Sequence, residues 1–179
     1  MNMAYKEVTK HREELCKFRV ILCPGSKCEQ LMPLSSFDEH AKTCSHISLR
    51  ASQSQVFKLD RKRYDDGNIS WNTQIFHLKK ETFALRVSMR NSNFNFETMM
   101  LAERGKCNRF MTTISIRDPK SATFFNGQFN PSPIGPTNTE ESTFTVHKKS
   151  LAKIFTINEQ DKCEFTIDFK VSEKRALNS

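Results

Sequence analysis

Apolar and polar side chains alternate with a period of two in several parts of the chain after residue 47. The clearest case lies between residues 163 and 171, where every second side chain is apolar: Cys163, Phe165, Ile167, Phe169 and Val171. Alternation of this kind indicates a β-strand with one buried face and one wet face. The pattern repeats at Phe83, Leu85, Val87 and Met89, and again at Phe110, Thr112, Ile114 and Ile116.

Weaker strand candidates fill the rest of this region, at residues 55–59, 71–78, 94–102, 121–129 and 142–147. Turn signals such as Asp66-Gly67-Asn68 and Asn91-Ser92-Asn93 separate the candidates. Short strands at this spacing, without parallel βαβ alternation, predict a mainly β fold built as an antiparallel β-sandwich.

Two segments within this region do not have the strand pattern. Residues 131–140 are too rich in proline for a strand and are expected to form a loop. Residues 150–155 predict one or two helical turns, with Leu151, Ile154 and Phe155 facing the core.

The composition of the chain changes near residue 47. Four of the six cysteines precede that point, at positions 16, 23, 28 and 44. The sequence therefore predicts a zinc-finger region over residues 1–47 and a β-sandwich over residues 48–179.

A metal-binding pattern stands out in the first region. Cys23 and Cys28 are separated by four residues that include a proline and Gly25, and His40 and Cys44 follow with three residues between them. Glycine lets the first segment fold back on itself, and positions i and i+4 share one face of a helix. Three thiolates and one imidazole complete a tetrahedral zinc site without an open position, which is the structural kind. Leu31, Leu34 and Phe37 are expected to form the small core of this finger.

The remaining cysteines have other expected roles. His11 and Cys16 resemble the closing half of another finger, but these two ligands are expected to be metal-free or to be completed by residues outside this sequence. Cys107 and Cys163 lie in strand-like context, and we expect them to be structural thiols.

Charge and hydropathy bear on whether the chain binds nucleic acid and on where it is located. The 179 residues carry a formal net charge of +8, but the basic side chains are scattered. The segment between Cys28 and His40 is apolar and acidic, unlike a helix that reads bases, which argues against nucleic-acid binding. No apolar run is long enough to span a membrane, and no apolar signal-peptide core begins the sequence. These features favour a location in the cytoplasm, the nucleus or both rather than secretion.

The sequence shows no catalytic constellation. It has no Gly-x-Ser-x-Gly elbow, no glycine loop that cradles phosphate and no HExxH motif. The pattern therefore favours a binding module over a hydrolytic enzyme.

The finger region resembles a known family. The run His11-Arg-Glu-Glu-Leu-Cys16-Lys-Phe-Arg-Val-Ile-Leu-Cys23-Pro-Gly-Ser-Lys-Cys28 is similar to the tandem fingers of the seven-in-absentia (Sina/Siah) proteins and their TRAF relatives. Asn68-Ile-Ser-Trp71, Phe83-Ala-Leu-Arg-Val87 and residues 150–155 resemble later parts of the same family.

This resemblance implies a function as well as a fold. Sina/Siah proteins are RING-type E3 ubiquitin ligases whose fingers and TRAF-like sandwich bind substrates, and whose sandwich forms homodimers. The resemblance implies the substrate-recognition portion of such a ligase, with a degron-like peptide held near Trp71 and Thr73. An E2 enzyme would bind only through a RING, whose ligand series these residues do not contain. A non-enzymatic TRAF-like adaptor with the same fold is the alternative.

Overall fold

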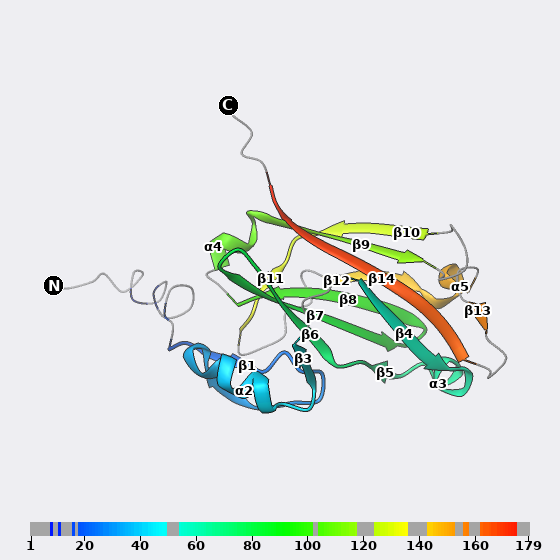
Figure 1. Cartoon of the computed structure of the whole chain (residues 1–179), viewed down its shortest axis with the longest axis horizontal. Helices are drawn as coiled ribbons and strands as arrows, with labels where there is room; N and C mark the ends of the chain where they lie inside the picture. The colour runs from blue at the N-terminus through cyan, green and yellow to red at the C-terminus, as the bar shows by residue number, and fades with distance from the viewer. Residues whose placement is uncertain are drawn as a thin grey trace.

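The computed structural model describes residues 8, 11, 16, 18–49, 54–101, 104–117, 124–135, 143–152, 156–157 and 162–174. Within them, two sheets and a small hairpin account for the strands (Figure 1). The mainly β fold that the sequence predicts is confirmed, with a Cys3His cluster near the N-terminus. No helix in the described parts of the chain is both long enough and apolar enough to cross a membrane.

The larger sheet has seven strands. Its main path runs in the order β11 (Ser132–Pro133), β8 (Asn93–Met100), β7 (Glu81–Arg90), β6 (Thr73–Leu78) and β3 (Ile47–Leu49). Off this path, β12 (Thr143–His147) pairs with β8, and β5 (Ile69–Ser70) pairs with β7. A tight turn joins β7 to β8, with positive φ at Asn91 and Ser92, as hairpin turns of the primed types require.

The smaller sheet has five strands. Its path runs in the order β10 (Phe124–Phe129), β9 (Phe110–Arg117), β14 (Lys162–Glu173) and β13 (Thr156–Ile157), and β4 (Ser54–Asp60) also pairs with β14. Short helices α3 (Arg61–Asp66), α4 (Arg104–Cys107) and α5 (Lys148–Leu151) lie in the connections. Leu151 is buried, as expected, while Ile154 and Phe155 lie outside the described residues.

Two short parallel pairings interrupt the otherwise antiparallel arrangement. β3 pairs with β6, and β11 pairs with β8. The expectation that residues 131–140 contain no strand is therefore wrong at Ser132 and Pro133. A strand of two residues has no periodicity to read, and Pro133 occupies the outer position of its sheet, where a missing N–H costs nothing.

Phenylalanine dominates the core between the two sheets. The fully buried side chains include Phe83, Phe94 and Phe96 from the larger sheet and Phe165 from the smaller one. Ring centroids of neighbouring pairs, such as Phe94 and Phe165, lie 5.7 Å apart in edge-to-face contact. Close approach also fixes Gly127 in β10, because a Cβ there would lie 2.3 Å from the Phe144 ring.

The finger packs on the outer face of the larger sheet. It consists of the hairpin β1 (Val20–Leu22) and β2 (Leu31–Pro33), the 3-10 turn η2 (Leu34–Ser36) and the helix α2 (Phe37–Thr43). Its buried side chains contact Ile75, Ala84 and Met99 of the sheet. β3 spans the expected boundary between the two regions and pairs with β6 of the sandwich.

This packing corrects one expectation from the sequence. Period-two alternation predicts a wet face for β7, yet Ala84, Arg86 and Ser88 are buried as well as the apolar positions. The finger covers much of that face. Both faces of β7 are therefore buried, and the alternation in its sequence distinguishes an apolar face from a face that also carries polar side chains.

Candidate metal centre

Four side chains from two segments converge at the finger. The segment between Cys23 and Cys28 forms a tight knuckle, in which the Cys28 N–H donates to the Gly25 carbonyl at 2.9 Å. The Gly25 N–H lies 3.4 Å from the Cys23 sulfur and donates to it. A Cβ on Gly25 would lie 3.0 Å from the Cβ of His46, so the close fold predicted for this glycine is confirmed.

The helix α2 supplies the other half of the cluster. His40 lies within it, and Cys44 follows directly as the C-cap residue, its N–H donating to the His40 carbonyl at 2.9 Å. Phe37 is buried in the finger core and fixes the helix against the hairpin. Leu31, expected in that core, is 58% exposed instead, and Ile21 and Met32 occupy the inner side of the hairpin.

The distances within the cluster match a tetrahedral site. The ligand atoms of Cys23, Cys28, His40 and Cys44 all lie within 4.8 Å of one another. His40 Nε2 lies 3.2 Å from the Cys23 sulfur and 3.5 Å from the Cys28 sulfur. A tetrahedral zinc with bonds of about 2.3 Å to sulfur and 2.0 Å to nitrogen separates such atoms by about 3.5 Å. The four residues can hold a metal ion, with every coordination position taken by the protein.

Burial affects the protonation of the Cys23 thiol. Desolvation raises the pKa of Cys23 to about 12, against the opposing effect of the Gly25 N–H. A thiol in such surroundings stays protonated at neutral pH unless a cation replaces the proton. A metal ion supplies that charge, and thiolate ligation releases the proton.

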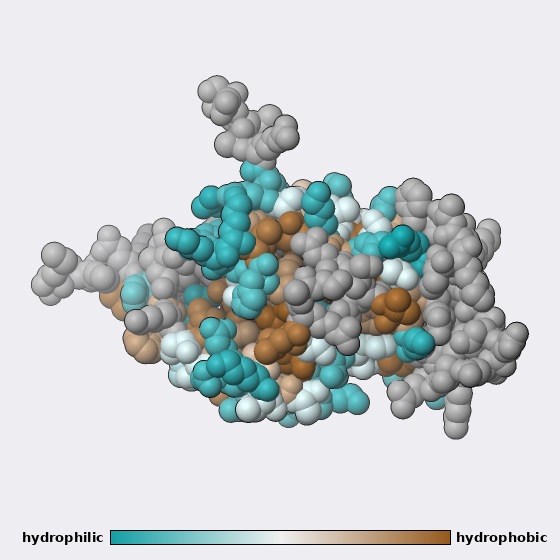
Figure 2. All heavy atoms as spheres, viewed as in Figure 1, coloured by the Kyte–Doolittle hydropathy of each residue, from teal (hydrophilic) through white to brown (hydrophobic). Residues whose placement is uncertain are grey.

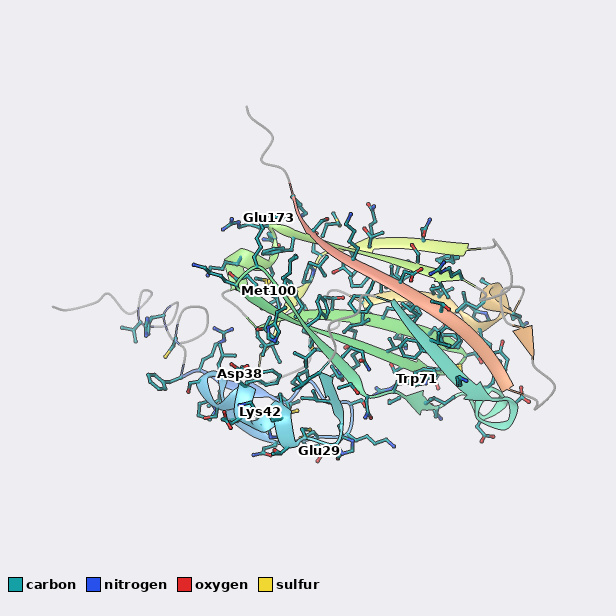
Figure 3. The ribbon with its side chains drawn as sticks, viewed as in Figure 1. Glu29, Asp38, Lys42, Trp71, Met100 and Glu173 are labelled. Carbon is teal, nitrogen blue, oxygen red and sulfur yellow. The ribbon has the colours of Figure 1, made fainter. Side chains whose placement is uncertain are left out.

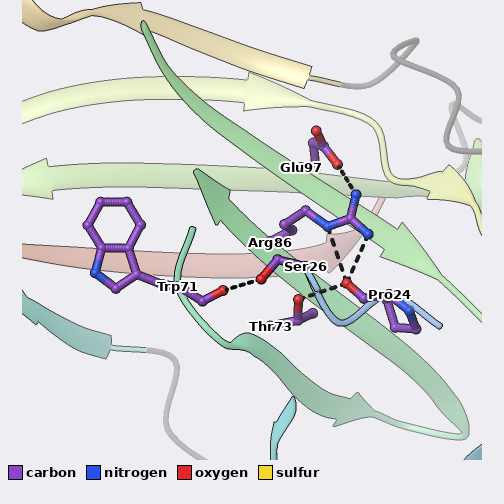
Figure 4. A network of polar contacts seen from close by, with 6 residues as sticks. All are labelled: Pro24, Ser26, Trp71, Thr73, Arg86 and Glu97. Atoms are coloured by element: carbon purple, nitrogen blue, oxygen red, sulfur yellow. Dashed lines mark hydrogen bonds and ion pairs between the residues drawn. The ribbon is translucent and has the colours of Figure 1, made fainter. Parts of the chain in front are cut away.

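The carbonyl of Pro24, inside the knuckle, fastens the finger to the sandwich (Figure 4). Arg86 of β7 donates to it from Nε at 3.2 Å and from Nη2 at 2.9 Å. The Thr73 hydroxyl of β6 donates to the same oxygen at 2.8 Å. Arg86 also donates from Nη1 to Glu97 of β8 at 3.2 Å, so its buried charge is compensated. We call Pro24, Thr73, Arg86 and Glu97 the latch.

A second set of hydrogen bonds joins the knuckle to the chain around Trp71. The Ser26 hydroxyl donates to the Trp71 carbonyl at 3.1 Å, as Figure 4 shows. The Thr73 N–H donates to the His46 carbonyl at 3.0 Å, just beyond the last metal ligand. The metal cluster, the latch and the strand that follows Trp71 therefore form one connected unit.

Arg86 and Ser26 were not identified from the sequence as functional residues. Arg86 occupies a position of β7 that the alternation assigns to the wet face, and nothing local distinguishes it from a solvated arginine. Its role depends on the finger folding back over the sheet, about sixty positions away in the chain.

His11 and Cys16 lie outside the metal cluster. The Cys16 N–H donates to the His11 carbonyl at 2.7 Å, the His11 side chain is exposed and Cys16 is a partly buried free thiol. Among the described residues, neither side chain belongs to a group that could hold a metal. Cys107 is buried as a free thiol, as expected, and the Cys163 side chain lies outside the described residues.

The two residues expected at a peptide groove differ in accessibility. Trp71 is partly buried, with its ring against Phe57, Phe94 and Phe165, and it directly follows β5 (Figure 3). Thr73 is fully buried and its hydroxyl is occupied by the latch. Thr73 therefore has no surface on which a peptide could dock and acts in the contact between finger and sheet.

Comparison of the sequence with protein-family models and with curated proteins finds no match.

Proposed function

We propose that this chain recognises a protein partner, holding an extended segment of it along β4 beside Trp71, and that zinc occupies the Cys3His cluster. The resemblance of the finger to Sina/Siah proteins supports the role of substrate recognition for a ubiquitin ligase. A closed set of four protein ligands leaves no position for a substrate, which supports a structural role for the metal.

The observation that carries the proposal is the open edge of β4. Within the described residues, this strand of seven residues pairs only with β14, so it lies at the edge of its sheet. An extended peptide can add to such an edge through main-chain hydrogen bonds.

Apolar side chains adjoin this edge and can supply selectivity. Phe57 of β4 lies edge-to-face with the Trp71 ring, with centroids 5.5 Å apart. Val56, on the opposite side of β4, is 55% exposed. Figure 2 shows hydrophobic surface among polar residues on the face where β4 and β14 lie in Figure 1. A peptide strand beside β4 would place its alternate side chains next to Val56.

The test compares two exposed apolar residues. Val56→Lys alters the proposed docking strand, whereas Leu31→Lys changes a residue of similar exposure, 58%, on the finger hairpin. Both variants are expected to keep the melting temperature of the parent chain. Selection from a library of random peptides of about twelve residues should fail with Val56→Lys and succeed with Leu31→Lys. Equal selection by both variants would exclude the β4 edge.

The ligase and adaptor alternatives share this binding surface. Either way, residues 1–179 alone are expected not to assemble ubiquitin chains, because chain formation by a RING-type ligase needs an E2-binding RING. Incubation with ubiquitin, E1 and a panel of E2 enzymes tests this. Ubiquitin chains formed by this polypeptide would contradict the assignment of a pure recognition role.

The resemblance also implies a homodimer, in which a second copy of this chain could lie beside β4. Light scattering at micromolar concentration distinguishes a dimer from the 20.8 kDa monomer. If Val56→Lys also abolishes a dimer, the β4 edge joins two copies and the partner segment must compete for it.

A further inference from the structure

A cavity of about 420 Å³ opens between the metal knuckle and the sandwich. Its lining comes from three places: Lys27 in the knuckle, Arg90 at the end of β7, and the segment leading into β5 with Asp66, Asn68, Ile69 and Ser70. The volume falls within the range of about 300–1,000 Å³ that is usual for ligand pockets. We call it the knuckle pocket.

Two cationic side chains line the knuckle pocket. Lys27 and Arg90 are exposed, and within the described residues neither forms an ion pair or a side-chain hydrogen bond. In contrast, Arg86 interacts with Pro24 and Glu97. It lies four positions before Arg90, on the same face of β7. Among the described lining residues Asp66 is the one acidic side chain, so two cations against one carboxylate leave a single positive charge there.

The backbone of β5 faces the same opening. Ser70 pairs with Ser88, and the Trp71 N–H donates to the Val87 carbonyl at 3.2 Å. In an antiparallel ladder the bonded positions alternate, so Ser70 is a non-hydrogen-bonded position relative to β7. Its N–H and C=O therefore point to the other edge of β5, where no described strand pairs with it.

We propose that the knuckle pocket binds an acidic side chain, Asp or Glu, of an extended protein segment that pairs with Ser70 at the free edge of β5. Lys27 and Arg90 hold the carboxylate, and the Ser70 backbone fixes the segment that carries it. One carboxylate balances the pocket's single excess positive charge, whereas Asp66 repels a second anionic charge. The proposal rests on the proposed recognition of a protein partner and adds the chemistry of one position in that partner.

The metal knuckle positions half of this site. Lys27 directly precedes the ligand Cys28, and the neighbouring Ser26 donates to the Trp71 carbonyl. Because the latch fastens the Pro24 carbonyl to β6 and β7, the backbone that carries Lys27 is fixed relative to the sheet. This arrangement gives the finger a part in recognition besides its part in folding.

The test uses purified chain with its metal and an array of randomised peptides about ten residues long, in which each position is fixed in turn as each amino acid. The parent chain is expected to select Asp or Glu over Asn and Gln at one position. Lys27→Met and Arg90→Met should each weaken that preference about fivefold, as for loss of a partly exposed ion pair. Asp66→Asn should strengthen it.

A matched control is Lys170→Met, which removes an exposed cation of β14 in the smaller sheet and should leave the preference unchanged. Metal content and melting temperature are measured for every variant, so that altered folding is recognised. Peptide selection without an acidic preference, or with a preference that both pocket variants retain, overturns this proposal and leaves the proposed function standing. Selection of no peptide at all counts against both.

Discussion

Different interactions stabilise the sandwich and the finger. Between the two sheets, fully buried side chains such as Phe83, Phe94 and Phe165 form a continuous apolar core. The finger buries fewer apolar side chains, and its contact with the sheet combines this apolar packing with hydrogen bonds from Arg86 and Thr73 to one carbonyl. In Figure 3, Asp38 and Lys42 mark the finger helix on one side, away from Glu173 at the end of the sandwich.

Because of this difference, we expect the two regions to unfold separately. Burial of the sandwich core depends on no added component, because hydrophobic burial acts whenever the strands assemble. The finger is expected to depend on the metal that its four ligands can hold, since so short a segment buries little surface of its own. The finger is therefore expected to melt locally while the sandwich remains folded.

The largest effect is expected for Cys28→Ser. Structural zinc contributes roughly 10–16 kcal/mol in small finger peptides, and three ligands cannot retain the ion as four do. Amide hydrogen exchange should show lost protection in α2 and β1 with β14 and β9 still protected. Cys16→Ser is the matched control, because Cys16 lies outside the cluster and its loss should leave metal content unchanged.

Phe165→Ala tests the other region and should have the next largest effect. Phe165 is fully buried and stacks on Phe57 at 5.5 Å, so its removal leaves a cavity that the sheets cannot close. Loss of a buried Phe side chain costs about 3–5 kcal/mol of unfolding free energy. Urea denaturation followed by Trp71 fluorescence measures the change. Global stability that does not fall would contradict the assignment of the core.

Arg86→Met tests the contact between the two regions. Hydrogen bonds to charged groups contribute about 1.5–3 kcal/mol, and Arg86 donates two to Pro24 while Glu97 is left without its partner in the variant. Arg90→Met is the matched control on the same face of β7, because Arg90 has no ion-pair partner among the described residues, and its expected cost is below about 0.5 kcal/mol. Proteolysis of the finger should accelerate in the first variant only.

Glu173→Gln should have the smallest effect, and it depends on pH. Hydrogen bonds from Lys79 and then Arg109 lower the pKa of the partly buried Glu173 carboxyl. A lowered folded-state pKa stabilises the fold above the unfolded pKa, and this contribution disappears as pH falls through the folded value. Urea midpoints of the parent and variant should therefore differ slightly at pH 7 and converge near pH 2. A difference that grows in acid would contradict this pairing.

Local chemistry explains what the sequence predicts well. The strands β14 and β9 follow from alternation over eight or more residues, and the four metal ligands follow from residue type and spacing. Both patterns depend on neighbours in the chain. The buried faces of Phe165 and Ile114 could therefore be assigned before the fold was known.

Long-range packing explains what the sequence does not predict. Arg86 and Thr73 serve the finger only because the chain returns across the sheet, and the exposed position of Leu31 depends on which side of its hairpin faces Ala84. The short strands β3, β5 and β11 have no period of their own and exist because longer neighbours offer an edge. These features are properties of the assembled sheets rather than of any local segment.

The stoichiometry of bound metal tests the central claim most directly. Purified, reduced chain is passed through a desalting column, and its zinc and protein contents are measured by elemental analysis. The account predicts one zinc per chain, held by Cys23, Cys28, His40 and Cys44, with loss of the ion for Cys28→Ser. A zinc-to-chain ratio near zero in folded protein whose cysteines remain unmodified would contradict it.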